Sequence, residues 1–142
     1  MENNIWGPHL WIILHSLAEK IKNNSEEKRL WSGLLSSLRW SLPCPQCKKH
    51  YTEYYSANII HSPTQIRTWL YNLHSQINDR LGKENITIEE LSELYNKPFN
   101  FSYHYSFVSA QMATAIRLGG NRNDIQRTFR FLHEIKCFYD QF

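Results

Sequence analysis

The feature that most constrains the fold is the spacing of apolar residues, which recur every three or four positions along most of this 142-residue chain. Residues with that spacing share one face of an α-helix. The sequence shows no sustained alternation of apolar and polar residues, the pattern that indicates strands. We therefore expect an all-α protein, a bundle of antiparallel helices joined by short loops. The helical sets are Leu10, Leu14, Leu17 and Ile21; Trp31, Leu34, Leu35 and Leu38; Ile66, Leu70, Leu73, Ile77 and Leu81; and Ile125, Phe129, Leu132 and Ile135.

Capping residues and helix breakers predict where these helices begin and end. Serine, threonine and proline are expected at helix starts, whereas glycine is expected just after helix ends. The expected helices start at Pro8, at Ser25 and near Cys44 (to about Asn58), then run from Ser62-Pro63 to Gly82 and from Thr87 to Tyr95, with two more at roughly 103–118 and 123–139 on either side of Gly119-Gly120.

The composition is typical of a soluble globular domain, with 42% hydrophobic and 20% charged residues. The aromatic share of 14% predicts either a thick core or a flat aromatic ligand, and Trp31 and Trp40 are expected in the core. A net charge of +3 is too small to predict nucleic-acid binding. We find neither an apolar run long enough to span a membrane nor a secretory signal, so we expect no membrane span.

Cys44 and Cys47 are two cysteines one helical turn apart, and they carry the clearest chemical signal in the sequence. A helix N-terminus stabilises a thiolate, and Pro43-Cys44-Pro45 places Cys44 where a helix begins. We expect the outer Cys44 to meet the substrate and the inner Cys47 to meet whatever lies deeper. The third cysteine, Cys137, has no partner nearby in sequence and is expected to be exposed on the last helix.

Three kinds of site use a cysteine pair with this spacing. Half of a zinc site is one, although the remaining ligands would have to come from the scattered His50, His61 and Cys137. A thioredoxin-like motif is another, but it requires a preceding strand that the sequence does not show. The third is a dithiol that passes electrons to a cofactor held between helices. The tryptophans and histidines on both flanking segments favour this third kind.

Three blocks of sequence together resemble those of a known family. They are Trp6-Gly7-x-x-x-Trp11-x-x-x-His15, Pro43-Cys44-x-x-Cys47 and Trp69-x-x-x-x-His74-x-x-Ile77-Asn78-x-x-Leu81-Gly82-Lys83. In order and spacing they resemble the Erv/ALR family of FAD-linked sulfhydryl oxidases, and most of all its compact members from large DNA viruses. The resemblance covers roughly residues 5–95.

The resemblance implies a four-helix bundle with a short fifth helix, in which FAD binds at the bundle mouth. Residues 1–97 would form this FAD-binding bundle, and residues 98–142 would be a C-terminal helical extension packed on the same domain. Cys44 would be the interchange cysteine and Cys47 the flavin-proximal one, with no metal. Tyr51 is expected either beside the flavin or in the plain core. The implied cofactor contacts are Gly7, Trp11, His15, Tyr51, His74, Ile77, Asn78 and Lys83.

The activity that the resemblance implies is formation of disulfides in protein thiols. Electrons would pass through the cysteine pair and FAD to molecular oxygen and give hydrogen peroxide. The implied partners are a thioredoxin-like or CxxC-bearing carrier and a second copy of the chain, with no nucleic acid. The expected location is the cytoplasm, meaning host cytoplasm or virion if the source is viral, with the mitochondrial intermembrane space as the alternative. The competing hypothesis is a zinc-stabilised or catalytically inactive helical interaction module.

Overall fold

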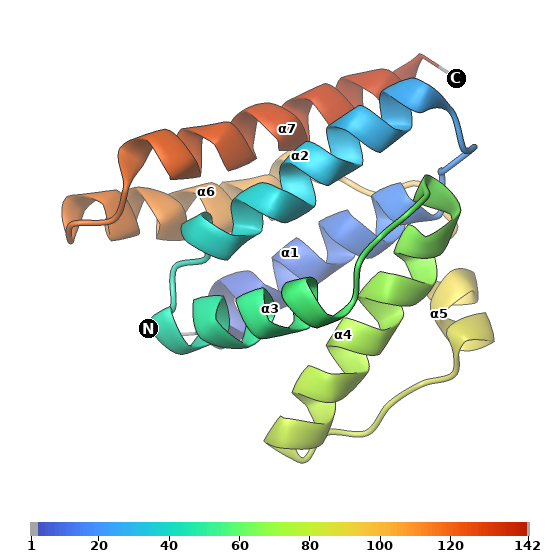
Figure 1. The fold of residues 1–142 in the computed structure, drawn as a ribbon, viewed down its shortest axis with the longest axis horizontal. Coiled ribbons are helices and arrows are strands. Elements are labelled where there is room, and N and C mark those ends of the chain that lie inside the picture. The colour runs from blue at the N-terminus through green and yellow to red at the C-terminus, as the bar shows by residue number, and fades with distance from the viewer. Residues whose placement is uncertain (1–2, 142) are drawn as a thin grey trace.

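The computed structural model describes residues 3–141, and this part of the chain contains seven α-helices and one short 3₁₀ turn but no strand (Figure 1). The prediction of an all-α fold is therefore confirmed. The helices are α1 (Asn3–Ala18), α2 (Ser25–Ser41), α3 (Pro45–Ala57), α4 (Ile66–Leu81, preceded by the turn Pro63–Gln65), α5 (Ile88–Tyr95), α6 (Phe101–Arg117) and α7 (Arg122–Asp140).

Most helix boundaries lie where the caps predicted them. Cys44 is the N-cap of α3, and its Sγ accepts a hydrogen bond from the Cys47 amide at 3.2 Å. The Thr87 hydroxyl and the Glu90 side chain form the expected capping box at the start of α5. Gly82 ends α4 with a φ of 70°, in the left-handed region that glycine adopts without strain.

One predicted helix start, at Pro8, and one predicted N-cap, Ser25, are wrong. Pro8 lies inside α1, which already begins at Asn3; a proline removes one intrahelical hydrogen bond, but its fixed φ suits a helix. Asn24, not Ser25, is the N-cap of α2. Its side chain accepts a hydrogen bond from the Glu27 amide, and the Glu27 carboxylate accepts one from the Asn24 amide. This reciprocal pair satisfies two backbone donors at once.

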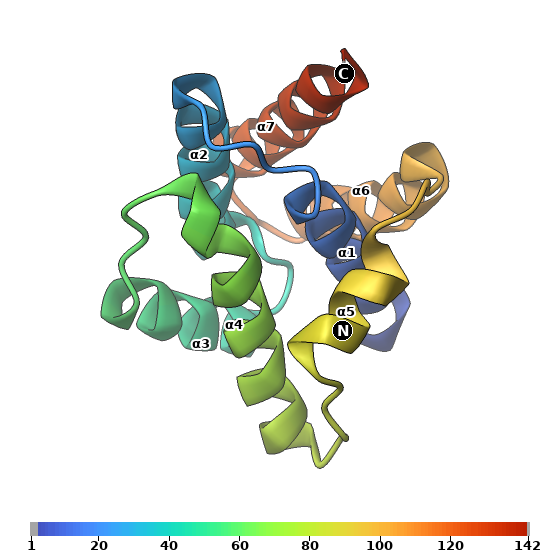
Figure 2. The ribbon, with the colours of Figure 1, turned by 90° about the vertical axis from the view of Figure 1, so that its right-hand side faces the viewer.

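The two C-terminal helices cover the two N-terminal ones. Helix α7 lies along α2, and α6 packs against α1 (Figure 1). On the other side of α1, α4 crosses it, and the short α5 lies against it (Figure 2). A single apolar cluster runs through these helices, from Leu17 and Trp31 to Met112 and Leu132. The C-terminal helices therefore share their core with α1 and α2.

Helix α2 shows that a large aromatic residue is not always in the core, whereas the helical period selects the buried face correctly. Trp31 is fully buried, as predicted, together with Leu34, Leu35 and Leu38. Trp40 is instead 51% exposed at the last turn of α2, so its assignment to the core was wrong. The C-terminal turn of α2 leads directly to the segment that carries Cys44, so Trp40 is an exposed residue four positions before that cysteine.

Candidate active site

The cysteine pair lies at the junction of α2 and α3. Leu42 and Pro43 are buried in the connection between α2 and α3, and Cys44 follows them as the N-cap residue of α3. Both cysteine side chains are half-buried and pack beside the core. The hydrogen bond from the Cys47 amide and the positive end of the α3 dipole both favour negative charge on the Cys44 Sγ.

A stack of four flat rings joins α1, α4 and α5. The indole of Trp11 lies on the imidazole of His74, with ring centres 4.1 Å apart and planes tilted by 2°. His15 stacks at 5.2 Å from Trp11 and at 5.0 Å from Tyr95, the last residue of α5. Rings that are parallel to within about 30° in this way define the orientation that a further flat ring would take beside them.

Two of these rings form a buried histidine pair. His15 Nε2 and His74 Nδ1 are 2.9 Å apart, so one nitrogen donates and the other accepts. Burial, with a smaller contribution from His74, lowers the pKa of His15 to about 3. Burial, with a smaller contribution from the Lys83 charge, lowers the pKa of His74 to about 4. Both imidazoles are therefore neutral at neutral pH.

The other ring nitrogen of His15 lacks a partner. Its Nδ1 is buried and forms no hydrogen bond with any residue that the structure describes. A buried polar atom left without a partner costs about 1–3 kcal/mol. Such an atom is rare in a native protein and calls for a ligand or a water to complete it. The His15 side of the stack is therefore suited to a ligand that combines a flat ring with a polar group.

A cavity of about 170 Å³ opens beside the stack, between α4 and the segment that follows it. Asn78 donates to the Asn85 side chain at 3.0 Å, which folds this segment back along α4. Ligand sites usually enclose about 300–1,000 Å³, so this cavity holds only part of a large cofactor. Its lining combines polar and aromatic residues: Tyr71, His74, Ser75, Asn78, Glu84, Asn85, Ile86, Leu91 and Tyr95.

Comparison with known proteins identifies the family. The model of the Erv1 / Alr family matches residues 8–96. The chain belongs to the Erv1/Alr family. It is 23% identical over 106 residues to the putative FAD-linked sulfhydryl oxidase 096R of Invertebrate iridescent virus 3, an alignment that covers 70% of this chain and 72% of that protein.

Other similar proteins carry related names. An FAD-linked sulfhydryl oxidase of African swine fever virus (isolate Pig/Kenya/KEN-50/1950) is 27% identical over 96 residues, or 65% of this chain and 81% of that protein. The FAD-linked sulfhydryl oxidase ERV1 of Oryza sativa subsp. japonica is 24% identical over 95 residues, or 64% of this chain and 49% of that protein. No solved structure matches the chain.

In this Erv1/Alr protein, the predicted cofactor residues fall into two groups. Trp11, His15 and His74 meet in the ring stack, and Asn78 lines the cavity next to them. Ile77 packs against the core, and Lys83 is exposed just after α4. No atom lies within 4 Å of the position that a Cβ on Gly7 would occupy, so the structure shows no close packing there. Contact of these residues with FAD stays a prediction.

Tyr51 lies in the core between α2, α3 and α4. Its hydroxyl donates to the Leu35 carbonyl at 2.5 Å, and its ring meets Trp69 edge-on at 6.1 Å. Burial raises the pKa of this phenol well above its ordinary value. The hydroxyl is committed to α2, so only the ring remains for a cofactor contact, which stays a prediction.

Sequence reasoning missed the residues that hold α5 in place. The nearly buried Glu19 carboxylate lies 3.5 Å from the Arg67 guanidinium. Arg67 donates to the Ser92 hydroxyl at 2.8 Å, and that hydroxyl donates to Glu19 at 3.2 Å. The three residues tie α1, α4 and α5 together, and this fixes Tyr95 against His15. No local sequence signal marks them, because they lie far apart in the chain.

Proposed function

We propose that this Erv1/Alr chain is an FAD-linked sulfhydryl oxidase that forms disulfides in protein thiols. The observation that carries the proposal is the ring stack of Trp11, His74 and His15, with an unpartnered buried nitrogen on His15. The stack offers aromatic faces and a hydrogen-bonding site, which is what a flavin or adenine ring requires. The similar proteins named as FAD-linked sulfhydryl oxidases support the same function.

The residues present fit FAD. Trp11, His15 and His74 would hold its rings, with Gly7, Tyr51 and Ile77 near them, and Asn78 and Lys83 would approach its polar parts. Bound FAD would supply the two-electron acceptor and pass the electrons to oxygen, giving hydrogen peroxide. The neutral state of both imidazoles at neutral pH keeps them available as hydrogen-bonding groups rather than as charges.

The thiol chemistry belongs to Cys44 and Cys47. In the oxidised pair, a substrate thiolate attacks the Cys44 Sγ, forms a mixed disulfide and breaks the Cys44–Cys47 bond, whose electron pair goes to the Cys47 Sγ. The second substrate thiol, after losing its proton, attacks the substrate sulfur of that mixed disulfide and releases Cys44 as a thiolate. The substrate leaves with one disulfide, and the pair holds two electrons. The Cys47 amide and the α3 dipole stabilise the released Cys44 thiolate.

We propose protein thiols on a thioredoxin-like or CxxC-bearing carrier as substrates, a second copy of the chain as a partner, and host cytoplasm or virion as the location if the source is viral. No described helix is both long and apolar enough to cross a membrane. The zinc-module alternative has no observation in its favour, because residues 3–141 contain no group of three or more metal-ligating side chains placed to hold an ion.

The purified protein tests this function directly. We expect visible flavin absorption with about one FAD per chain, and oxidation of dithiothreitol with release of hydrogen peroxide. Cys44→Ser should leave a Cys47 thiolate next to the flavin and give a long-wavelength charge-transfer band, whereas Cys47→Ser, the matched variant, should not. A colourless protein containing one zinc per chain would contradict the proposal. A band in Cys47→Ser alone would reverse the roles of the two cysteines.

A further inference from the structure

The surface around Cys44 is free of acidic residues over a long stretch of sequence. Between Glu27 and Glu53 the chain contains no aspartate or glutamate. Lys48 and Lys49 follow Cys47 in the first turns of α3, the former half-buried and the latter exposed. Neither lysine forms an ion pair with the residues that the structure describes. Lys48 and Lys49 therefore place positive charge beside the cysteine pair with no ion-pair partner among the described residues.

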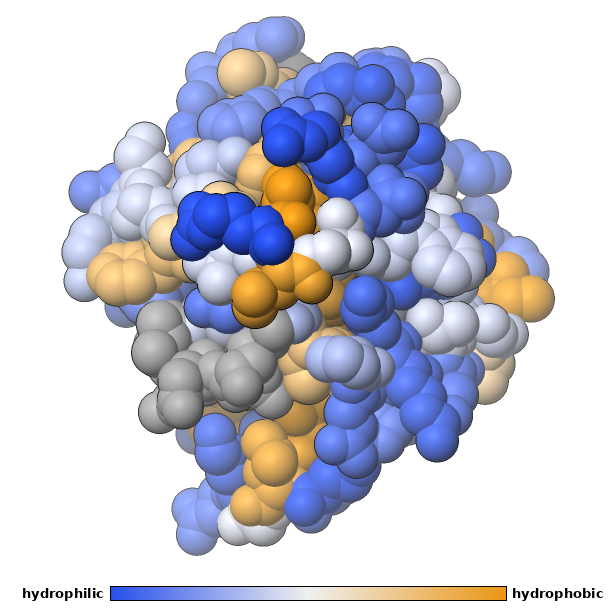
Figure 3. Space-filling view, turned by 90° about the vertical axis from the view of Figure 1, so that its left-hand side faces the viewer, coloured by the Kyte–Doolittle hydropathy of each residue, from blue (hydrophilic) through white to orange (hydrophobic). Residues whose placement is uncertain are grey.

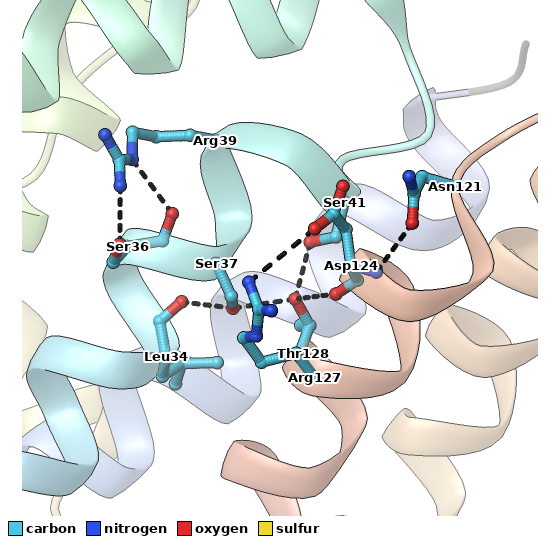
Figure 4. Close-up of polar contacts among 9 residues, drawn as sticks. All are labelled: Leu34, Ser36, Ser37, Arg39, Ser41, Asn121, Asp124, Arg127 and Thr128. Atoms are coloured by element: carbon cyan, nitrogen blue, oxygen red, sulfur yellow. Dashed lines mark hydrogen bonds and ion pairs between the residues drawn. The ribbon is translucent and has the colours of Figure 1, made fainter.

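Trp40 adds an exposed aromatic ring to this surface. Its ring is 51% exposed, and the Arg39 guanidinium lies 5.3 Å from its centre and 4.7 Å from that of Tyr55 on α3. Two hydrogen bonds to Ser36, at 3.0 and 2.6 Å, hold Arg39 in place (Figure 4). Trp40 is thus an exposed indole beside a fixed guanidinium, and tryptophan is among the residues enriched at the energetic centres of protein interfaces.

The neighbouring α7 does not cancel this charge. Thr128 of α7 lies 2.7 Å from the Ser41 hydroxyl, which joins the start of α7 to the end of α2 (Figure 4). The acid on this part of α7, Asp124, lies 3.6 Å from its own Arg127. Figure 3 shows the left-hand side of Figure 1, where some hydrophobic residues lie exposed among polar ones. The α2–α3 junction therefore combines the exposed Trp40 ring with two lysines that have no ion-pair partner among the described residues.

We propose that Trp40, Lys48 and Lys49 form a docking surface around Cys44 for protein substrates that carry acidic side chains beside their cysteine pair. The inference rests on the proposed thiol oxidase function and names its substrate class. Opposite charge raises the association rate of such a substrate by roughly 10–10³ fold at low salt. The lysines also favour the thiolate of the incoming cysteine, the form that attacks Cys44.

The test compares two reduced Cys-x-x-Cys peptides, one flanked by aspartate and glutamate and one flanked by lysine. With the FAD-loaded full-length protein at low salt, kcat/KM should be about tenfold higher for the acidic peptide, and the ratio should approach one at about 0.5 M NaCl. Lys49→Glu should lower the rate for the acidic peptide and raise it for the basic one, so that the preference is lost or reversed. Trp40→Ala should lower kcat/KM for both peptides.

Lys20→Glu is the matched control, because Lys20 is exposed after α1, at the opposite end of α2 from Cys44. It should retain the wild-type ratio. Equal rates for the two peptides with the wild-type protein, or equal losses in Lys49→Glu and Lys20→Glu, would overturn the docking surface. Failure of the wild-type protein to oxidise dithiothreitol would instead overturn the oxidase function itself, since that neutral reductant needs no docking surface.

Discussion

Polar side chains are buried in two regions of the molecule, and their hydrogen bonding differs. Between α2 and α7, the Glu27 carboxylate accepts hydrogen bonds from the Lys22 and Asn24 amides and from the Tyr139 hydroxyl. The Trp31 indole donates to that same hydroxyl at 3.0 Å. In the ring stack between α1, α4 and α5, the His15 Nδ1 is buried with no partner among the described residues.

The difference separates a structural contact from a binding site. A buried polar network stabilises a fold when its members are satisfied, since an unsatisfied member costs most of what the network contributes. The network of Glu27, Tyr139 and Trp31 meets that condition and helps to fix α7 on α2. The ring stack does not meet it within the chain, which is the behaviour of a site completed by a ligand. Mutations in the two regions should therefore change different quantities.

The largest effect expected is on stability, in the α2–α7 region. Trp31→Ala removes a fully buried side chain and a buried hydrogen bond, and should lower the free energy of unfolding by about 3–5 kcal/mol. Trp11→Ala removes a half-buried ring and should cost less than about 2 kcal/mol, while FAD affinity falls about tenfold or more through loss of stacking. Urea unfolding and flavin titration measure the two quantities.

A milder variant covers the case in which Trp31→Ala does not fold. Trp31→Phe keeps most of the ring but removes the indole donor, and should cost about 1–2 kcal/mol with FAD affinity unchanged. If Trp31→Phe weakened FAD binding as much as Trp11→Ala, the distinction between the two regions would be wrong.

The next effect is the pH dependence of stability, which should come from the ring stack. The folded-state pKa of His15 is about 3 and that of His74 about 4, whereas unfolded histidine titrates near 6.5. Below about pH 6.5 the unfolded chain binds protons that the folded chain does not. The free energy of unfolding should therefore be greatest above about pH 6.5 and fall toward pH 4, by at most about 1.4 kcal/mol per pH unit for His15.

His15→Gln should reduce this slope by close to one proton, as read from urea unfolding at about pH 7, 6 and 5. His133→Gln is the matched control, since His133 is exposed on α7 and lies outside the ring stack. A slope that is the same in His15→Gln and in the wild-type protein would show that the stack does not set the pH dependence.

The smallest effect is expected at Cys137, on the outer side of α7. Its side chain is exposed, as the sequence predicted, and it belongs to α7, outside the ring stack. Cys137→Ser should leave the free energy of unfolding unchanged, because the side chain is exposed. The rate of dithiothreitol oxidation should stay within about twofold of the wild-type rate, because dithiothreitol can reach Cys44 directly. A loss of turnover beyond about tenfold, roughly 1.4 kcal/mol in the barrier, would place Cys137 in the catalytic cycle after all.

Local sequence determined the helices and the placement of the reactive cysteine. The period of apolar residues predicts most of the long helices, because one buried face requires that spacing wherever the helix docks. Cys44 as a helix N-cap, the Thr87 capping box and the left-handed Gly82 were also predictable, since each depends on atoms within a few residues. Asn24 was missed as the N-cap because its neighbour Ser25 is also a favoured capping residue. Pro8 was misjudged because a proline favours a helix start but does not exclude one further upstream.

The tertiary structure decided which helix faces meet. His15 and His74 are 59 positions apart, and their hydrogen bond exists only because α1 and α4 cross at those residues. The Glu19, Arg67 and Ser92 contacts and the position of Tyr95 depend on how α5 docks. A helical period does not determine which neighbouring helix covers each face. In this fold the packing leaves Trp40 51% exposed. Contacts between distant residues are set by the packing of whole helices, and for that reason the ring stack and the surface around Cys44 are visible only in the folded chain.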